Sequence, residues 1–481
     1  MGRHCDVEAG GCGLKRVVVI GAGIAGLAAA HRLVEETKAK SIELDVLLME
    51  KENRLGGTIL TEKHEGFVIE GGPDCFLSEK PWALDLAERI GITDRVDGTV
   101  EKNKGVFMMW GSKLHPLPEG VFLMVPTKLM PLFTSSLLSW RGKLRMALEP
   151  FVSKRTGGKE ESLAEFVTRR LGREALERIA EPLVAGIHAG EPEGMSLEAS
   201  FPRFKQLEDR YGSLVRGMLT HTKGAVRSPR RTIFVSFKDG LAQFAESIAD
   251  VIGRERLRLG TAAGSIERGT QNRWKVSTLS GEAIDADAVI LAAPAHASAS
   301  IVSGIDPDLS AELGGIPYVG TATVSLAYDA KDVEGKAVGF GFVVPRLEGR
   351  RIMAATYSSR KFRRRAPEGK ALVRCFIGGS QRPDLVERKP QELADIAVAE
   401  LADILGIKAD PLWAKVYGWP NSMPQTVLGH AQRMKRITSK LEKLPGIEIA
   451  GGAYDGLGIP DCVRVGEAAA ERILETLFPA G

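Results

Sequence analysis

The sequence predicts an α/β fold in which one parallel-sheet domain is interrupted by two long insertions. Residues 16–20 (RVVVI) form an unbroken β-branched run, typical of a buried parallel strand, and lead through a glycine turn into a helix of small residues. Buried strands of the same kind recur at residues 286–292 (ADAVILA) and 446–450 (GIEIA). Three separated pieces with one pattern predict a single sheet that the chain leaves twice and rejoins.

The N-terminal piece reads as a βαβ unit. After the first strand, a helix is expected to run to about Glu36, and residues 42–49 form a second strand that ends before Glu50. The later pieces contain predicted strands at residues 256–268 and 273–278 and a predicted helix at residues 463–477.

The two insertions differ in their hydrophobic pattern. The first has helical periodicity, for example at residues 81–90 and 162–171, whereas the second alternates apolar and polar residues at 322–328, 339–344 and 371–378. We therefore expect one mainly helical domain and one mixed β-sheet domain. The expected boundaries are residues 14–75, 226–304 and 431–481 for the parallel-sheet domain, 76–100 and 305–430 for the mixed-sheet domain, and 101–225 for the helical domain.

Composition narrows the class of protein. With 44% hydrophobic and 26% charged residues, the 481-residue chain is globular, and a net charge of +4 is too small to suggest nucleic acid as a partner. The five cysteines are scattered without a CxxC pair, so neither a disulfide framework nor a metal site is expected. Residues 1–13 resemble neither a secretory signal nor a transit peptide, and no stretch is apolar enough to span a bilayer. These features predict a cytoplasmic protein.

The first glycine turn, residues 21–26 (GAGIAG), matches G-x-G-x-x-G between a strand and a helix. Gly21 permits the tight turn, Gly23 lets the backbone approach a pyrophosphate, and Gly26 lets helix and strand pack closely. Glu50 follows the second strand, where a carboxylate can accept hydrogen bonds from a ribose diol. The combination predicts a dinucleotide site. The alternative is an ordinary glycine turn with a surface glutamate.

A second motif decides between nicotinamide and flavin cofactors. Residues 50–57 match E-x-x-x-R-x-G-G through Glu50, Arg54, Gly56 and Gly57, so a second glycine turn lies beside the ribose acid. This pattern resembles that of the superfamily of FAD-dependent amine oxidases, phytoene desaturases and protoporphyrinogen oxidases. The resemblance implies FAD as the cofactor, a Rossmann-like FAD-binding domain with two insertions, and a mixed β-sheet substrate domain.

Four further strings resemble protoporphyrinogen oxidases and their bacterial coproporphyrinogen-oxidising relatives. They are residues 66–77 (GFVIEGGPDCFL), 181–190 (EPLVAGIHAG), 419–425 (WPNSMPQ) and 456–463 (GLGIPDCV). The resemblance spans about residues 15–475 and implies a flavoprotein that removes six electrons from a porphyrinogen in three rounds, with O2 as acceptor and H2O2 as product. Protoporphyrinogen IX and coproporphyrinogen III both stay open as substrates.

Carried over to this sequence, the resemblance implies FAD contacts along several segments. Ala263 stands where the family often carries valine beside the adenine, and Asp74 stands where relatives vary among Asn, Arg, Glu and Asp, which leaves the charge near the flavin open. No catalytic acid or base is expected, because pyrrole N–H loss follows readily once a cationic intermediate forms. The expected contacts are Gly21, Ala22, Gly23, Ile24, Ala25, Gly26, Glu50, Lys51, Arg54, Gly56, Gly57, Thr58, Gly72, Pro73, Asp74, Ala263, Trp419, Leu457, Gly458 and Ile459.

Two alternative functions stay open. An amine or carotenoid substrate would keep FAD, and an amine oxidase would place an aromatic pair at the flavin, which Trp419 and Tyr454 could form. A non-catalytic protein with a flavin-binding fold is the other alternative, and colourless purified protein would identify it.

Basic residues in the insertions are candidates for binding anionic partners, either substrate carboxylates or a membrane surface. Lys80 is the candidate for binding a substrate carboxylate, with a solvated lysine before Pro81 as the alternative. Eight basic residues between Arg346 and Arg365 either attract carboxylates or form a solvated face. The apolar stretch at residues 121–140 is followed by Arg141, Lys143, Arg145, Lys154 and Arg155, which predicts a face for an anionic membrane or, alternatively, a core lining a channel. The oligomeric state is open, with a homodimer as one option.

Overall fold

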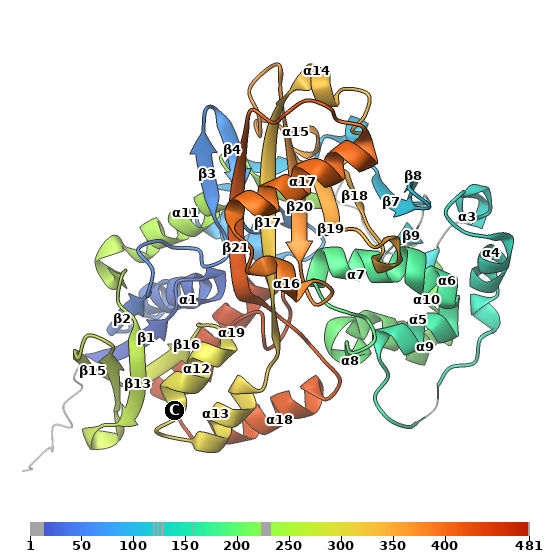
Figure 1. Cartoon of the computed structure of the whole chain (residues 1–481). Helices are drawn as coiled ribbons and strands as arrows, with labels where there is room; N and C mark the ends of the chain where they lie inside the picture. The colour runs from blue at the N-terminus through green and yellow to red at the C-terminus, as the bar shows by residue number, and fades with distance from the viewer. Residues whose placement is uncertain are drawn as a thin grey trace, which may run out of the picture.

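The computed structural model consists of three bodies of secondary structure (Figure 1). A parallel sheet with its helices lies at the lower left, a taller mixed sheet stands above it, and a group of short helices lies on the right. The structure describes residues 14–118, 121–122, 125–126, 129–155, 157–222 and 232–479. Residues 1–13, and residues 123–124 and 127–128 of the apolar stretch, lie outside the described residues.

The first body is built on a five-stranded parallel sheet, which confirms the predicted α/β class and the βαβ unit. Val17 and Val19 of the first strand point into one hydrophobic cluster, whereas Val18 and Ile20 point into another. A strand buried on both faces needs apolar residues at every position, which explains the unbroken RVVVI run. The strands lie in the order β12 (Leu257–Arg258), β2 (Leu44–Met49), β1 (Lys15–Ile20), β16 (Ala288–Leu291) and β22 (Ile447–Ile449).

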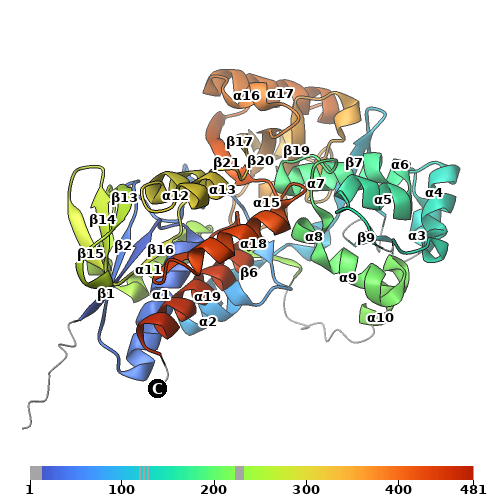
Figure 2. The ribbon, with the colours of Figure 1, turned by 90° about the horizontal axis from the view of Figure 1, so that it is seen from below.

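Helices cover both faces of this sheet. On one face are α1 (Ile24–Lys40), α2 (Trp82–Arg89), α11 (Ala242–Ile252) and α19 (Ile459–Leu477), and Figure 2 shows α1, α2 and α19 lying together. On the other face are α12 (Ala295–Val302), α13 (Pro307–Gly314), α18 (His430–Leu441) and a sheet of β13 (Ala263–Arg268), β14 (Trp274–Thr278) and β15 (Ala283–Ala286).

Two elements differ from the sequence-based expectation. The strand expected at residues 256–268 is two strands, β12 and β13, because Gly260 adopts a φ of +64° and turns the chain between them. Helix α19 begins at Ile459, before the expected start at residue 463, because Pro460 fits the first helical turn.

The second body is a seven-stranded sheet. Its order is β21 (Trp413–Pro424), β17 (Tyr318–Asp329), β20 (Lys370–Gly378), β19 (Ile352–Tyr357), β18 (Gly341–Val343), β7 (Val106–Trp110) and β8 (Lys113–Pro116). Only the pair β7–β18 among these described strands is parallel, so the sheet is mixed as predicted. Leu393, Ala397 and Leu401 of α17 (Pro390–Leu405) pack against it.

The expected boundaries of the insertions do not coincide with these bodies. Strand β7 was expected in the helical insertion, but its Met109 joins the core of the seven-stranded sheet while Met108 joins the helical core, because successive residues of a strand point to opposite faces. Residues 76–100 were expected with the mixed sheet. Instead, Ala83 and Leu86 of α2 pack into the core of the parallel-sheet body, beside α19.

The third body is helical, as predicted for most of residues 101–225. Its helices are α3 (Leu129–Thr134), α4 (Trp140–Ala147), α5 (Leu163–Leu171), α6 (Arg173–Ala175), η4 (Leu176–Ala180), α7 (Glu181–His188), α8 (Leu197–Ser200), α9 (Pro202–Tyr211) and α10 (Leu214–Thr222). Ser162 and Glu165 form a capping box that starts α5. No helix in the described part of the chain is both long and apolar enough to cross a membrane.

Shorter elements lie within and between the three bodies. The strands are β3 (Thr61–His64), β4 (Phe67–Glu70), β5 (Phe76–Leu77), β6 (Val96–Gly98), β9 (Val121–Phe122), β10 (Val125–Pro126) and β11 (Phe234–Phe237). The helices are α14 (Ala330–Val333), α15 (Ser358–Lys361), α16 (Pro383–Val386) and the 3-10 turn η3 (Glu149–Phe151).

Candidate active site

The first glycine turn lies at the carboxyl end of β1, where parallel sheets bind ligands. Gly21 adopts a φ of +105°, and a Cβ at Gly26 would lie 1.9 Å from the Gly21 carbonyl oxygen, so both glycines are required by the backbone itself. Gly23 is different. A Cβ there would meet no protein atom within 4 Å, so this glycine keeps open the space at the N-terminus of α1.

Glu50 joins the first turn to the end of β2. The carboxylate is 9% exposed and accepts hydrogen bonds from the Ala22 N–H at 2.7 Å and from the Glu52 N–H at 3.0 Å. The Glu50 carbonyl accepts a bond from the Thr261 N–H at 2.7 Å, which brings the start of β13, with Ala263, to the same edge. Neighbouring Lys51 is exposed and pairs with Glu52 at 3.6 Å.

The second glycine turn packs directly against the first. Gly56 N–H donates to the Ala22 carbonyl at 2.8 Å, and a Cβ at Gly57 would lie 3.2 Å from the Cα of Gly23. Arg54 holds this turn by donating to the Gly57 carbonyl at 2.6 Å and to the Ile59 carbonyl at 3.2 Å.

Arg54 also reaches the seven-stranded sheet. Its guanidinium lies 5.8 Å from the centre of the Trp419 ring, and the indole N–H of Trp419 donates to the Gly71 carbonyl at 2.8 Å. A Cβ at Gly72 would lie 1.7 Å from the Thr58 carbonyl oxygen, so the GGPD string touches the second turn as well. The structure thus brings four separated strings of the sequence into one continuous surface.

Three residues that the sequence analysis did not predict hold the GGPD string. Thr323 on β17 donates to the Gly71 carbonyl at 2.8 Å, and Arg374 on β20 donates to the Gly72 carbonyl. The ammonium of Lys361 on α15 lies 2.8 Å from the Asp74 carboxylate. All three come from the second insertion, hundreds of residues away in sequence, so no local pattern could have indicated them.

The charge of Asp74, which the sequence left open, is compensated. Burial alone would raise the pKa of Asp74, but the Lys361 ammonium and the Arg374 guanidinium hold it well below its usual range. Burial, together with the Asp74 charge, raises the pKa of the neighbouring Cys75 to about 12, so this cysteine is a neutral thiol.

The N-terminus of α19 completes the site. Neither α19, whose N-cap is Gly458, nor α1, whose N-cap is Gly23, has a side-chain cap, so each leaves backbone N–H groups available to an anionic ligand. Lys80, three residues beyond the GGPDCFL string, pairs with the buried carboxylate of Asp461 in the GIPDCV string at 2.5 Å. Burial and the charge of Lys80 lower the pKa of nearby His188 to about 4, so His188 is neutral at physiological pH.

Other sequence-based candidates do not meet at this site. Tyr454 is buried in the core of the parallel-sheet body, and no ring contact among the described residues joins it to Trp419. The basic run between Arg346 and Arg365 is not one patch. Arg346 pairs with Glu193, Arg350 with Asp403, and Arg365 with buried Glu70, because the run winds through a hairpin and a helix that point in different directions.

The geometry fits a long dinucleotide. Two uncapped helix N-termini, two contacting glycine turns and the open space at Gly23 offer backbone N–H groups to a pyrophosphate, and Glu50 and the β13 start lie at one end of this surface. The GGPD string and the α19 N-terminus lie at the other end, where the second half of the ligand would be held.

Comparisons with known proteins agree with this fit. Residues 24–474 match the family model described as flavin containing amine oxidoreductase. The chain is 33% identical over 471 residues to coproporphyrinogen III oxidase of Bacillus subtilis (strain 168), covering 97% of this chain and 99% of the relative. It is 30% identical over 489 residues to chloroplastic protoporphyrinogen oxidase of Oryza sativa subsp. japonica, covering 96% and 88%.

A solved structure shows that the likeness extends to the whole fold. A crystal structure of a protein from Exiguobacterium sp. 255-15 is 32% identical, has a TM-score of 0.83, and is matched over 96% of this chain and 99% of that chain. The matched regions include both insertions as well as the parallel-sheet body. The chain therefore belongs to the flavin-containing amine oxidoreductase family and is an FAD-dependent oxidoreductase.

Proposed function

We propose that the protein oxidises a porphyrinogen to a porphyrin, with coproporphyrinogen III as the first substrate to test and O2 as the electron acceptor. The carrying observation is that the strings resembling porphyrinogen oxidases, 66–77, 419–425 and 456–463, converge. The Trp419 indole N–H donates to the Gly71 carbonyl, and Lys80, just beyond the first string, pairs with Asp461 of the last. The near-full-length relatives are named coproporphyrinogen III oxidase and protoporphyrinogen oxidase.

In this proposal FAD extends along the surface described above. Glu50 binds the adenosine ribose, with Lys51 and Ala263 nearby, and residues 21–26 together with Gly56, Gly57 and Thr58 contact the pyrophosphate through their backbone. Arg54 and Trp419 hold the two glycine segments together. Residues 72–74 and 457–459 flank the flavin ring.

The chemistry divides between cofactor and protein. When bound, FAD accepts a hydride from the substrate and passes electrons to O2. The chain orients the macrocycle and excludes water, and no side chain at the surface is assigned as a catalytic acid or base. His188 is neutral and half-buried and therefore contributes shape and polarity near Lys80 without adding a charge. The seven-stranded sheet, which faces the GGPD string, forms the substrate side of the site.

The function is tested by side-by-side turnover of coproporphyrinogen III and protoporphyrinogen IX, followed by porphyrin fluorescence, O2 uptake and H2O2 release. The proposal expects three O2 consumed and three H2O2 formed for each porphyrin, because six electrons leave in pairs. Purified yellow protein that oxidises neither porphyrinogen but oxidises an amine would contradict the proposal in favour of an amine oxidase. Faster turnover of protoporphyrinogen IX would reverse the order of the two substrates.

Glu50→Ala is expected to weaken FAD binding about ten- to a hundredfold, because a charge-assisted hydrogen bond to the ribose contributes about 1.5–3 kcal/mol. The measurement is titration of deflavinated protein with FAD by flavin fluorescence. The control is Glu52→Ala, whose exposed side chain pairs with Lys51 and is expected to change nothing. If Glu52→Ala weakens binding and Glu50→Ala does not, the ribose contact belongs to Glu52.

Lys80→Ala is expected to raise KM for a carboxylated porphyrinogen more than for its methyl ester, with FAD content unchanged. The cation is 42% exposed although it pairs with Asp461, so it can also reach a flexible substrate carboxylate. The measurement is KM for both substrates with the wild type and the variant.

The Lys80–Asp461 ion pair allows a double-variant control for this prediction. If Lys80 serves only to compensate Asp461, the double variant Lys80→Ala with Asp461→Asn regains the wild-type KM. If Lys80 binds substrate, the double variant keeps the raised KM for the acid alone. Equal changes for acid and ester would remove Lys80 from carboxylate recognition.

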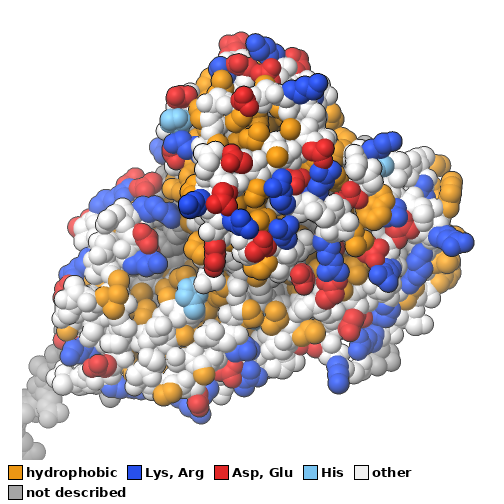
Figure 3. Space-filling view, viewed as in Figure 1, with side chains coloured by type: hydrophobic (Ala, Val, Ile, Leu, Met, Phe, Trp, Pro, Cys, Tyr) orange, Lys and Arg blue, Asp and Glu red, His pale blue; other side chains and the backbone are white. Residues whose placement is uncertain are grey.

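A second partner is proposed from the surface of the helical body: an anionic membrane. Large apolar side chains on α3, α4 and η3 are exposed, including Met130 at 73%, Trp140 at 71% and Phe151 at 78%. Figure 3, viewed as Figure 1, shows hydrophobic and basic side chains interspersed on the right edge, where α3 and α4 lie. A mixed apolar and basic surface of this kind suits insertion among lipid headgroups.

The five basic residues expected to support this surface differ in their surroundings. Arg155 forms ion pairs with Glu161 at 3.5 Å and Glu165 at 3.7 Å. Arg141 and Lys154 are exposed. Lys143, in contrast, is buried and donates to the Phe133 carbonyl at 2.9 Å, and Arg145 donates to the Arg170 carbonyl at 3.1 Å. Charge reversal at Lys143 or Arg145 would therefore disturb the helical body itself.

Wild-type protein is expected to float with anionic vesicles at low salt and to be released as ionic strength rises. Arg141→Glu with Lys154→Glu should reduce flotation, and Trp140→Ser with Phe151→Ser should abolish it. Leu279→Ser, at an equally exposed leucine (78%) on the parallel-sheet body, is the control and should float normally. Flotation that is absent, or equal for all variants, would contradict a membrane face here.

A further inference from the structure

The most deeply buried arginines of the structure differ in how their charge is compensated. Arg170 and Arg365 each form ion pairs with buried glutamates. Arg374 is equally buried, at 2% exposure, but within the described residues no ion pair joins it to a carboxylate. Its Nε and Nη1 have no hydrogen-bond partner among the described residues either, and its one hydrogen bond there runs from Nη2 to the Gly72 carbonyl.

An unpaired buried cation is costly, and arginine cannot escape the cost by losing its proton. Burying a charge without a partner disfavours the folded state, and the guanidinium stays protonated at any physiological pH. The face of the Phe376 ring, whose centre lies 4.7 Å from the guanidinium carbon, offsets part of this cost. The part of the charge that the ring does not offset produces a permanent positive electrostatic potential inside the protein.

This field acts on the GGPD string. The two carboxylates that act on Arg374, Asp74 and Glu70, are already engaged by other cations, Asp74 by Lys361 at 2.8 Å and Glu70 by Arg365 at 3.3 Å. Three cations and two anions therefore lie beside this string, which leaves one net positive charge. Arg374 carries this net charge, because Lys361 and Arg365 each have a carboxylate partner and an arginine keeps its proton at physiological pH.

We propose that Arg374 is an electrostatic positioning residue that favours reduction of bound FAD, because its uncompensated charge lies beside the segment that holds the flavin ring. The inference rests on the proposed function for the placement of FAD. A flavin that accepts a hydride gains a negative charge, and a fixed positive charge in a medium of low dielectric constant stabilises that charge without rearrangement. The negative charge of the reduced cofactor would in turn act as the counter-charge of Arg374, which has no carboxylate ion-pair partner among the described residues.

The test is the midpoint potential of bound FAD in Arg374→Gln, measured against a reference dye without any porphyrinogen. Glutamine can keep a hydrogen bond to the Gly72 carbonyl while the charge is lost. We expect the affinity for reduced FAD relative to that for oxidised FAD to fall about tenfold. For a two-electron couple, this lowers the midpoint potential by about 30 mV. Arg374→Lys should retain most of the wild-type potential. An unchanged potential in Arg374→Gln would overturn the inference.

A matched control variant distinguishes an effect of the Arg374 charge from an effect of the position of the GGPD backbone. Thr323→Val removes the neutral hydrogen bond to the adjacent Gly71 carbonyl and changes no charge. We expect its potential to stay at the wild-type value. If Thr323→Val and Arg374→Gln lower the potential equally, Arg374 acts only by holding the backbone, and the electrostatic proposal is wrong.

Two outcomes need separate handling. If Arg374→Gln purifies without FAD, the dissociation constants of oxidised and reduced FAD are measured anaerobically. Their ratio gives the difference in midpoint potential between bound and free FAD. If the wild type binds FAD but oxidises no porphyrinogen, the proposed function fails while the potentials still decide the role of Arg374.

Discussion

Gly23→Val is expected to give a folded but colourless protein that retains less than about a tenth of the wild-type FAD content. The expectation depends on the difference between this glycine and its neighbours. Gly23 has a φ of −66° and a ψ of 172°, which valine adopts readily, and a Cβ there meets no protein atom within 4 Å. The backbone and its neighbours therefore accommodate a Cβ at this position, and the side chain enters the space in front of the α1 N-terminus.

The neighbouring glycines cannot provide this test. Any substitution at Gly21 would be strained by the positive φ, and a Cβ at Gly26 would lie only 1.9 Å from the Gly21 carbonyl oxygen, so either change would disturb the turn itself. Gly304→Val is the matched control, because this exposed glycine also has open space around a Cβ and lies outside the site. The control should stay yellow with the same absorbance ratio as the wild type. A yellow Gly23→Val would place the pyrophosphate elsewhere.

The parts of the site that the sequence predicts are those whose function depends on neighbouring residues in the chain. The turn at residues 21–26 and the acid at Glu50 belong to one βαβ unit, so their spacing alone fixes their geometry. The parallel sheet was predictable for a related reason, since residues buried on two faces must be apolar at every position.

Long-range pairing accounts for what the sequence does not predict. Arg374 on β20 and Lys361 on α15 reach the GGPD string across about three hundred residues, and nothing in the sequence around either residue indicates this partner. For the same reason, Lys80 reads as a free cation in the sequence although it pairs with Asp461. The basic run at residues 346–365 looks like a patch only while its fold is unknown, because its members find carboxylates on different elements.

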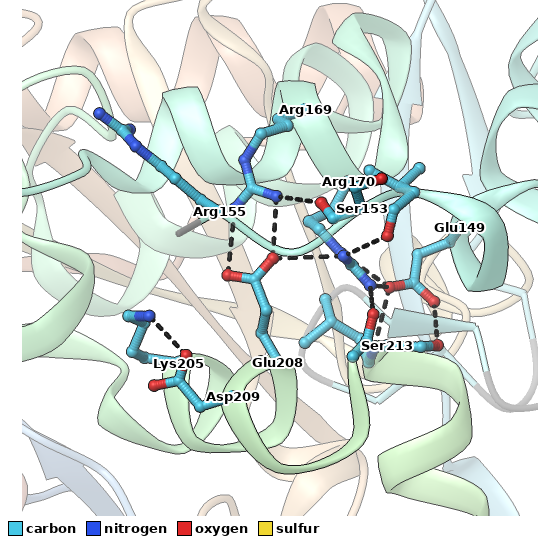
Figure 4. Close-up of polar contacts among 12 residues, drawn as sticks. Glu149, Ser153, Arg155, Arg169, Arg170, Lys205, Glu208, Asp209 and Ser213 are labelled. Carbon is cyan, nitrogen blue, oxygen red and sulfur yellow. Dashed lines mark hydrogen bonds and ion pairs between the residues drawn. The ribbon is translucent and has the colours of Figure 1, made fainter. Parts of the chain in front are cut away.

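The helical body contains a buried charge cluster on which its stability depends (Figure 4). Glu149 on η3 and Arg170 on α5 are both fully buried and joined by hydrogen bonds. The Glu149 carboxylate also accepts bonds from the Ser213 hydroxyl at 2.6 Å and the Leu214 N–H at 2.8 Å, at the start of α10. Arg170 in turn contacts Glu208 on α9 at 3.2 Å. The cluster therefore ties four elements of the body together.

Arg170→Met is expected to destabilise the helical body by about 3–5 kcal/mol, because it leaves Glu149 buried without its cation. Glu208 loses less, since Arg169 still contacts it at 2.8 Å. The measurement is hydrogen exchange of the α5 and α10 amides in the FAD-loaded protein, together with the thermal transition. Arg173→Ala removes an arginine that is 83% exposed from the same region and is the control, expected to change stability by less than about 0.5 kcal/mol.

A double variant tests whether the loss comes from the uncompensated charge. Adding Glu149→Gln to Arg170→Met removes the unpaired carboxylate, while the amide oxygen, placed where Oε2 lies, can still accept the bonds from the Ser213 hydroxyl and the Val215 N–H. The double variant should therefore be more stable than Arg170→Met alone, since an unpaired buried charge costs more than a neutral polar group. If the double variant is instead less stable by the sum of the two single losses, the residues contribute independently through packing, and the ion pair is not what holds η3, α5 and α10 together.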